Sequence, residues 1–324
     1  SNPMIKIENI YNASNILKGI ARETPILSSK KLNDLVSGNI YLKAENEQYS
    51  GSFKLRGAYY CMHQMLKTHA YTNVVACSSG NHAQGVALAA SQLGLKATIV
   101  IPNDAPKIKI KRTKDLGAEI IFYDRYNESR ESIAEDYAKK KNAFIIPPYD
   151  NFDVITGQGT VALEAIQQLS LIEETIDNFI CPIGGGGLIA GCSIALSECL
   201  NHVNIFGVEP EFLNDTQQSL QAGKRIKIDI NQPSLCDALM APIPGELTFS
   251  INQNNLKDIF TVSDDEVIHA IQFAYNEWNI IIEPGGAVGL ALILSGRFAT
   301  PMENTLIILS GGNIDPVEHQ NLIK

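Results

Sequence analysis

The strongest constraint on the fold is a regular alternation of short apolar runs with segments of helical periodicity. The apolar runs predict β-strands at residues 73–77, 96–101, 119–123, 143–147, 178–183, 204–209 and 305–310. The segments between them have the spacing of amphipathic helices, for example at residues 82–93 and 128–141. Strands that alternate with helices in this way are typical of parallel sheets covered by helices on both faces. The sequence therefore predicts an α/β protein.

Length and charge narrow the functional class. The chain has 324 residues, which is enough for two domains. Its formal net charge of -9 argues against nucleic acid or an anionic membrane as the partner, because both require a basic surface. No apolar run approaches the roughly 20 residues of a membrane-spanning helix. We therefore expect a small-molecule ligand, with no nucleic acid and no membrane as partner.

The six cysteines indicate the compartment, because they are scattered and form no CxxC pair. In a chain of this size, such cysteines predict reduced, mostly buried thiols in a cytoplasmic protein. No spacing of cysteine and histidine fits tetrahedral zinc. Polar residues precede Met4, so we expect no signal peptide.

Three polar or glycine-rich loops each follow a predicted strand. They are SSGNH (78–82), GGGG (184–187) and SGGN (310–313). In parallel sheets, ligands bind beyond the carboxyl ends of the strands. We therefore expect the three loops to converge on one site. The GGGG loop suits a phosphate, because glycines let the backbone close on the anion and the following helix presents free amides.

One lysine has an unusual setting, in the stretch SGSFKLRGAYY at residues 50–60. There Lys54 directly follows Phe53, among serines and glycines. A lysine amine forms a Schiff base with an aldehyde cofactor, most often pyridoxal phosphate. That chemistry needs a phosphate cradle, a partner for the pyridine nitrogen and a group that holds the substrate carboxylate. The GGGG loop, Ser310 and the SSGNH loop are the candidates for these three tasks.

A second interpretation of the glycine loop is a dinucleotide site. Gly185, Gly187 and Ala190 satisfy the pattern GxGxxG/A after a strand. Glu209 ends the next strand, at the spacing of the acid that contacts a ribose hydroxyl. This pattern predicts a nicotinamide-dependent oxidoreductase, but it gives no role to Lys54 or to the other two loops.

A series of short motifs resembles one known family. In chain order they are SGSFKLRGA, SSGNHAQGVALAA, GAEI, GQGTVALE, PIGGGGLIAG, PGELTF, EPGGAVGLA and SGGNIDP. Together they resemble the serine/threonine dehydratase and serine racemase family, which has the second fold type of pyridoxal-phosphate enzymes, similar to the tryptophan synthase β subunit. The resemblance implies a large domain from residues 1–70 and 150–324, and a small domain from residues 71–149. The site would lie in the cleft between them.

The resemblance also implies the residues that hold the cofactor, pyridoxal 5′-phosphate. Lys54 would bind it covalently and Phe53 would pack on it. The other cofactor-binding residues implied are Asn81 at the ring hydroxyl, Gly184, Gly185, Gly186, Gly187 and the Leu188 amide at the phosphate, Glu283 nearby, and Ser310 at the pyridine nitrogen.

The implied reaction is elimination. Ser78, Ser79 and His82 would surround the substrate carboxylate, and Lys54 would take the α-proton. Loss of the β-hydroxyl would then yield 2-oxobutanoate from L-threonine, or pyruvate from L-serine, together with ammonia. Two alternatives stay open: threo-3-hydroxyaspartate as the substrate, and serine racemase activity, in which Ser79 would return a proton on the opposite face.

The resemblance implies further properties of the whole protein. Family members bind a divalent cation near the phosphate loop, and the matching positions here are Glu209, the Leu213 carbonyl and Asp215. Oxygen ligands of this kind suit Mg²⁺ or Ca²⁺. A homodimer is also implied. Because the chain ends soon after SGGNIDP, we expect no regulatory domain of the biosynthetic threonine dehydratases.

Two further positions can be compared with the family pattern. Tyr149 stands where an aromatic residue is common in dehydratases, which favours elimination over racemisation. Gly285 stands where the family often has serine or alanine, and the sequence does not indicate what that changes.

Overall fold

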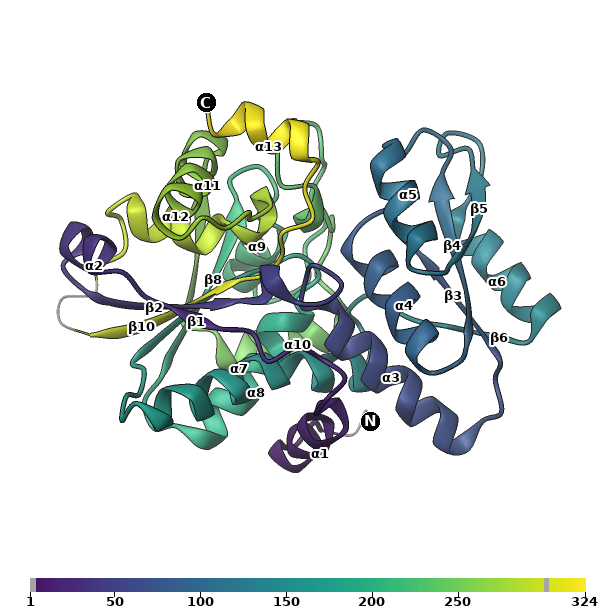
Figure 1. The fold of residues 1–324 in the computed structure, drawn as a ribbon, viewed down its shortest axis with the longest axis horizontal. Helices are drawn as coiled ribbons and strands as arrows, with labels where there is room; N and C mark the ends of the chain where they lie inside the picture. The colour runs from purple at the N-terminus through teal and green to yellow at the C-terminus, as the bar shows by residue number, and fades with distance from the viewer. Residues whose placement is uncertain (1–3, 300–302) are drawn as a thin grey trace.

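The computed structural model describes residues 4–299 and 303–324. Its strands form two sheets, which occupy different parts of the molecule (Figure 1). In spatial order, the six-stranded sheet consists of β1 (Ile26–Leu27), β2 (Asn39–Ala44), β10 (Asn304–Leu309), β7 (Asn178–Pro182), β8 (Asn204–Pro210) and β9 (Asp258–Val262). The four-stranded sheet consists of β5 (Glu119–Tyr123), β4 (Lys96–Pro102), β3 (Asn73–Cys77) and β6 (Ala143–Ile145).

The strand pairing confirms the predicted α/β class. All neighbouring strands are parallel except β1 and β2, which are antiparallel. Each strand expected from the sequence is present, with its ends shifted by at most two residues. The four-stranded sheet uses a continuous middle part of the chain, and the larger sheet uses both ends. The boundaries of the two domains stay a prediction.

Helices cover both faces of the larger sheet (Figure 1). One face packs against α1 (Ile7–Leu17), α7 (Phe152–Leu171), α8 (Gly187–Cys199) and α10 (Glu246–Asn255). The other face packs against α2 (Lys30–Val36), α11 (Asp264–Trp278), α12 (Val288–Leu294) and α13 (Pro316–Leu322). The two apolar cores are therefore separated by the sheet. The short helix α9 (Asp215–Ala222) follows β8.

The smaller sheet is covered in the same way. One core lies under α3 (Lys54–Thr68), α4 (Asn81–Gln92) and α5 (Lys107–Asp115), and a second, smaller core lies under α6 (Arg130–Lys141). Among residues 4–299 and 303–324 there are also three short 3₁₀ helices: η1 (Glu45–Glu47), η2 (Asp237–Leu239) and η3 (Pro284–Gly286). Within the described part of the chain, no helix combines the length and the apolar character needed to cross a membrane.

The two helices that begin at the SSGNH and GGGG loops have no side-chain cap at their first turns. The residue that precedes α4 is Gly80 and the residue that precedes α8 is Gly186, and neither has a side chain to cap its helix. The first backbone amides of a helix have no partner within the helix itself. Both loops therefore leave these amides free for an anion, which is also favoured there by the helix dipole.

Candidate active site

Lys54 is the first residue of α3 and its side chain reaches toward the segment before α7. The Nζ atom donates a hydrogen bond to the Pro148 carbonyl at 2.7 Å. It also lies 5.4 Å from the centre of the Phe53 ring. Burial of the amine lowers the pKa of Lys54 to about 8, because loss of water disfavours the charged form. The amine is therefore available as a base near neutral pH.

The backbone around Lys54 is held by the SGGN loop. Ser52 and Gly311 form an isolated β-bridge, and the Phe53 amide donates to the Ser310 carbonyl at 3.2 Å. Ser310 is buried beside this bridge. The predicted partner of the pyridine nitrogen thus lies next to the residue that precedes the lysine.

The SSGNH and SGGN loops meet at a buried carboxylate. The Asn81 amide donates to Glu283 Oε1 at 2.7 Å, and the Asn313 backbone N–H donates to Glu283 Oε2 at 2.8 Å. The Asn313 side chain donates to Asn81 Oδ1 at 2.8 Å. Burial raises the pKa of Glu283 to about 7. The side chain of Asn81 is fixed in orientation by both contacts.

The GGGG loop is shaped by close neighbours. Gly186 has φ +93°, which favours glycine. A Cβ atom on Gly185 would lie 2.1 Å from the Tyr149 ring, so no side chain fits there. Thr248 donates to the Gly185 carbonyl at 2.7 Å, and Asn252 donates to the Gly186 carbonyl at 3.2 Å. With the carbonyls bound on that side, the amides of the loop are left for a ligand.

These features fit a phosphate group. Gly187 and Leu188 form the uncapped first turn of α8. Gly184 precedes them beneath η2, where a Cβ atom would lie 3.2 Å from the Ala238 carbonyl. The loop is connected to the lysine through neighbouring residues, because Tyr149 packs on Gly185 and Pro148 accepts the bond from Lys54. All three predicted loops therefore converge on Lys54.

The SSGNH loop offers several donors for a carboxylate. Ser78 and Ser79 are half-exposed, and Ser78 Oγ accepts a bond from the Gly80 amide at 3.1 Å. The His82 ring is buried, with Nε2 2.9 Å from the Ile146 carbonyl. Burial lowers the pKa of His82 to about 3, so the ring is neutral and Nε2 is the donor. The His82 ring is thus bonded to Ile146, and the group left for a substrate carboxylate is the His82 backbone amide in the uncapped first turn of α4.

Arg130 is a candidate site residue that the sequence reasoning missed. It begins α6, which follows β5, and its carbonyl accepts a bond from Cys77 Sγ at 3.4 Å, directly before the SSGNH loop. Its half-exposed guanidinium pairs with Glu131 at 3.1 Å. Burial and the charge of Asp150 raise the pKa of Tyr149, and the positive charge of Arg130 opposes this rise. The backbone of Arg130 thus lies at the same sheet edge as the serines. Arg130 lies near the start of the helix predicted at residues 128–141, and no local sequence pattern indicates that it meets the SSGNH loop.

The predicted cation ligands form a buried carboxylate pair. Glu209 accepts bonds from the Thr216 amide at 3.1 Å and the Gln217 amide at 2.8 Å. Asp215 is buried and its Oδ2 atom has no hydrogen-bond partner. Burial raises the pKa of both carboxyls, that of Asp215 to about 6, and the two groups interact. The unpartnered oxygen and the paired acids fit a divalent cation, for which Leu213 would add a carbonyl ligand. Among the described residues, no cluster of three or more histidine, cysteine and acidic side chains occurs.

The inward position of Glu209 also bears on the dinucleotide interpretation. Both of its oxygens are bound to backbone amides at the start of α9. The side chain is fully buried, so it is not placed to contact a ribose hydroxyl.

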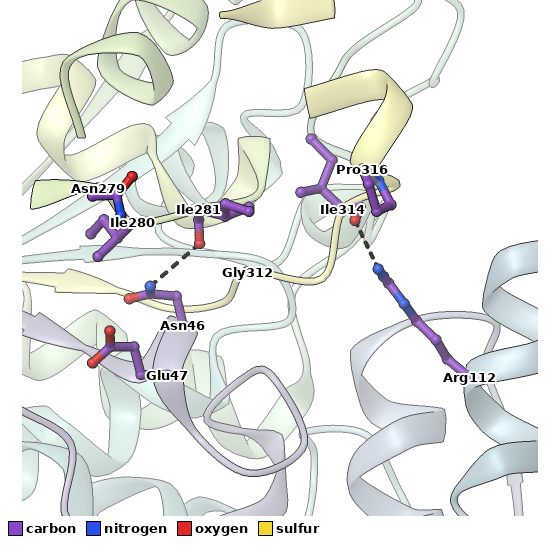
Figure 2. Close-up of a pocket in the computed structure, with 9 residues that line it drawn as sticks. All are labelled: Asn46, Glu47, Arg112, Asn279, Ile280, Ile281, Gly312, Ile314 and Pro316. Atoms are coloured by element: carbon purple, nitrogen blue, oxygen red, sulfur yellow. Dashed lines mark hydrogen bonds between the residues drawn. The ribbon is translucent and has the colours of Figure 1, made fainter. Parts of the chain in front are cut away.

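A pocket of about 360 Å³ lies against the SGGN loop, whose Gly312 lines it (Figure 2). It is crossed by two hydrogen bonds, from Arg112 Nη2 to the Ile314 carbonyl at 2.9 Å and from Asn46 Nδ2 to the Ile281 carbonyl at 3.3 Å. None of the predicted catalytic or cofactor-binding residues lines it. The Arg112 bond joins α5 of the smaller sheet to the segment before α13.

An amine of lowered pKa, an uncapped glycine cradle and two largely parallel sheets fit an α/β enzyme that binds a phosphate-bearing aldehyde cofactor. The chain belongs to the family of pyridoxal-phosphate dependent enzymes, whose family model matches residues 17–311. This assignment confirms the predicted cofactor, and it gives no support to the nicotinamide alternative.

Individual relatives and structures are similar over nearly the whole chain. An L-threo-3-hydroxyaspartate ammonia-lyase of Saccharomyces cerevisiae is 40% identical over 97% of this chain and 95% of its own length. An L-threonine ammonia-lyase of Thermotoga maritima is 36% identical over 96% of this chain and 76% of its own length. The structure of maize serine racemase has a TM-score of 0.92 at 34% identity, covering 98% of this chain and 96% of that one. The second fold type of pyridoxal-phosphate enzymes is thereby confirmed, and the chain lies in an ammonia-lyase and racemase family.

Proposed function

We propose that this protein is an ammonia-lyase that eliminates the β-hydroxyl of small 3-hydroxy amino acids. L-threo-3-hydroxyaspartate is the leading substrate, and L-threonine and L-serine are further substrates. The observation that carries the proposal is the Lys54 amine, with its pKa lowered to about 8, at the meeting point of three ligand-binding loops. A base of this kind is suited to remove an α-proton at neutral pH.

The residues described above would hold the cofactor. Gly184 to Leu188 would bind its phosphate, Asn81 would contact its ring hydroxyl, and Ser310 its ring nitrogen. Phe53 would pack beside it, and Lys54 would bind it covalently. When bound, pyridoxal phosphate draws electron density away from the substrate α-carbon and makes the α-proton removable.

The chain's own groups then divide the work on the substrate. The first-turn amides of α4, with the hydroxyls of Ser78 and Ser79, would hold the α-carboxylate and orient the α-carbon. The neutral Nζ of Lys54 would accept the α-proton. Departure of the β-hydroxyl with a proton removes one water, and later hydrolysis consumes one water and releases ammonia. The net products are a 2-oxo acid and ammonia.

Arg130 supports 3-hydroxyaspartate among the possible substrates. That amino acid carries a second carboxylate, which a guanidinium binds in a charge-assisted contact. Arg130 lies beside the residue that precedes the SSGNH loop. It is also within electrostatic reach of Tyr149, which packs on the phosphate cradle. The similarity to an L-threo-3-hydroxyaspartate ammonia-lyase supports the same choice. For this substrate the 2-oxo product is oxaloacetate.

Serine racemase activity is the second candidate. Ser79 supplies a half-exposed hydroxyl on the loop that would hold the carboxylate, and such a group could return a proton to the α-carbon. The similarity to maize serine racemase also supports this second candidate. A homodimer, a cytoplasmic location and a divalent cation at Glu209, Leu213 and Asp215 stay predictions.

The test is an incubation of the purified protein with pyridoxal phosphate and Mg²⁺. L-threo-3-hydroxyaspartate, L-threonine and L-serine are supplied separately, and 2-oxo acid and D-serine are measured. Oxo acid from 3-hydroxyaspartate at the highest kcat/KM supports the proposal. A larger yield of D-serine than of pyruvate would transfer the assignment to a racemase. Absence of both products from all three amino acids would reject the proposed function.

A further inference from the structure

The motif GQGTVALE has no role in the site described so far. It occupies residues 157–164 in the middle of α7. Helix α7 packs against α3 and also against α8 (Figure 1). These are the helices that begin at Lys54 and at the glycine cradle. The motif therefore lies between α3, which carries Lys54, and α8, which begins at the glycine cradle.

On the α3 side, the helices touch through backbone atoms. A Cβ atom on Gly157 would lie 2.7 Å from the Arg56 carbonyl oxygen and 2.7 Å from the Gly57 Cα atom. Conversely, a Cβ atom on Gly57 would lie 2.7 Å from the Val154 carbonyl oxygen. Real Cβ atoms do not approach so closely, so any larger residue at either position must push α3 away from α7.

A neutral side chain and an ion pair fix the alignment of α3 along α7. Gln158 Oε1 accepts a bond from the Gly57 amide at 3.0 Å. The buried Arg56 guanidinium donates to Glu164 Oε2 at 2.9 Å and to Thr160 Oγ1 at 3.3 Å. Since Gln158, Thr160 and Glu164 all belong to the motif, the motif sets both the distance and the register of α3.

On the α8 side the contact is equally close. A Cβ atom on Gly159 would lie 2.7 Å from the Gly191 carbonyl oxygen. A Cβ atom on Gly191 would lie 2.2 Å from the Ile155 carbonyl oxygen and 2.6 Å from the Gly159 amide nitrogen. Helix α8 is thus held against the opposite side of the same turn of α7.

We propose that Gly157 and Gly159 are positioning residues that set the separation between Lys54 and the phosphate cradle. Gly57 lies within one turn of Lys54 in α3, and Gly191 lies about one turn after Gly187 in α8. A displacement at either contact is therefore carried to the start of the helix. The inference rests on the proposed roles of Lys54 and the glycine loop.

The test compares Gly157→Ala with Gly159→Ala, which add the same atom on opposite sides of α7. Two ligands report on the two parts of the site. Pyridoxine 5′-phosphate has no aldehyde, so its affinity reports on the cradle alone. The rate at which pyridoxal 5′-phosphate forms a borohydride-reducible link reports on the Lys54 amine, since that bond joins the amine to the aldehyde carbon with loss of water.

For Gly157→Ala we expect the dissociation constant of pyridoxine 5′-phosphate to stay within about twofold of the wild-type value. The rate of link formation, and kcat on any substrate that is turned over, should each fall about tenfold or more, because small misplacements of a reacting group cost large factors in rate. For Gly159→Ala we expect the affinity for pyridoxine 5′-phosphate to fall about tenfold, with a link rate near the wild-type value once pyridoxal 5′-phosphate is saturating.

Equal losses of affinity and link rate in both variants would overturn the inference and leave a structural role only. If an alanine variant does not fold, Gln158→Ala takes its place, because it removes the bond to Gly57 without adding volume. It should slow link formation and spare the affinity for pyridoxine 5′-phosphate, and the reverse result would overturn the inference. Neither ligand measurement needs turnover, so a wild-type protein inert toward every amino acid would reject the proposed function and still allow this test.

Discussion

The Asn81 side chain donates a 2.7 Å hydrogen bond to Glu283, and this contact joins the loop after β3 to the loop before η3. Glu283 is 4% exposed, and its other oxygen accepts the Asn313 backbone amide. A buried carboxylate thus fixes both a predicted cofactor ligand and the SGGN loop. The arrangement leads to two predictions about one residue, in stability and in its dependence on pH.

Replacement of Glu283 by alanine should lower the free energy of unfolding by about 1–3 kcal/mol, because two buried donors lose their acceptor.

The pKa of Glu283 is raised from 4.5 to about 7, so its folded form binds more protons than its unfolded form between these values. Its contribution to stability is therefore complete below about pH 4.5 and is lost as the pH rises through 7. Urea unfolding of the wild type and of Glu283→Gln gives the free energy of unfolding at each pH between 5 and 8. This free energy should fall less steeply with pH in the variant. Parallel pH profiles would contradict this assignment.

Replacement of Arg130 by methionine should affect one substrate selectively. A lost charge-assisted hydrogen bond of about 1.5–3 kcal/mol predicts a fall in kcat/KM for 3-hydroxyaspartate of about 10- to 100-fold. The values for L-serine and L-threonine should stay within about threefold, since these have no second carboxylate. Arg125→Met is the matched control, because that arginine forms a surface ion pair with Asp104. Equal losses for all three substrates would remove Arg130 from substrate recognition.

The lowered pKa of Lys54 predicts the pH dependence of turnover. Only the neutral amine accepts a proton, so kcat should rise with pH and level off above about 8, where the pKa of Lys54 lies. Steady-state rates between pH 6 and 9.5 at saturating substrate measure this. A kcat that is constant from pH 6 upward would show that Lys54 is not the limiting base.

The carboxylate pair near the cradle predicts stabilisation by a divalent cation. Asp215 Oδ2 is buried and unpartnered beside Glu209, and a bound cation would supply its missing partner. Addition of Mg²⁺ or Ca²⁺ should raise the melting temperature of the wild type at neutral pH. The same addition should have little effect on Asp215→Asn. A shift of equal size in both proteins would place any bound cation elsewhere.

Much of this architecture could be predicted from local sequence signals. The apolar runs gave strands such as β3 and β8 nearly to the residue, because buried parallel strands are continuous apolar segments. Three strands of the larger sheet, β1, β2 and β9, were not predicted. In β2, Lys43 interrupts the apolar pattern, yet it is fully buried because it pairs with Glu164 and donates to the Thr24 carbonyl at 2.6 Å. No local rule indicates that partner.

The details of the site also depended on tertiary contacts. The sequence placed His82 near the substrate, but the bond from its ring to Ile146 depends on how β6 ends beside α4. Arg130 lies in a polar helix whose sequence gives no sign of the loop it meets. The effect of Gly285 is clear only in three dimensions, since a Cβ atom there would lie 3.2 Å from both Ala238 and Leu239. The absence of a side chain at this position lets η2 approach the site.

The Lys54 amine has two proposed tasks, which are to bind the cofactor and to remove the α-proton. The most direct measurement uses Lys54→Ala beside the wild type, with borohydride reduction, peptide mapping of the modified residue, and oxo-acid formation from L-threo-3-hydroxyaspartate. We expect the wild type to carry the reduced cofactor on the peptide that contains Lys54, and the variant to carry none and form no oxo acid. A reducible link on another lysine, or unchanged turnover by the variant, would contradict the account.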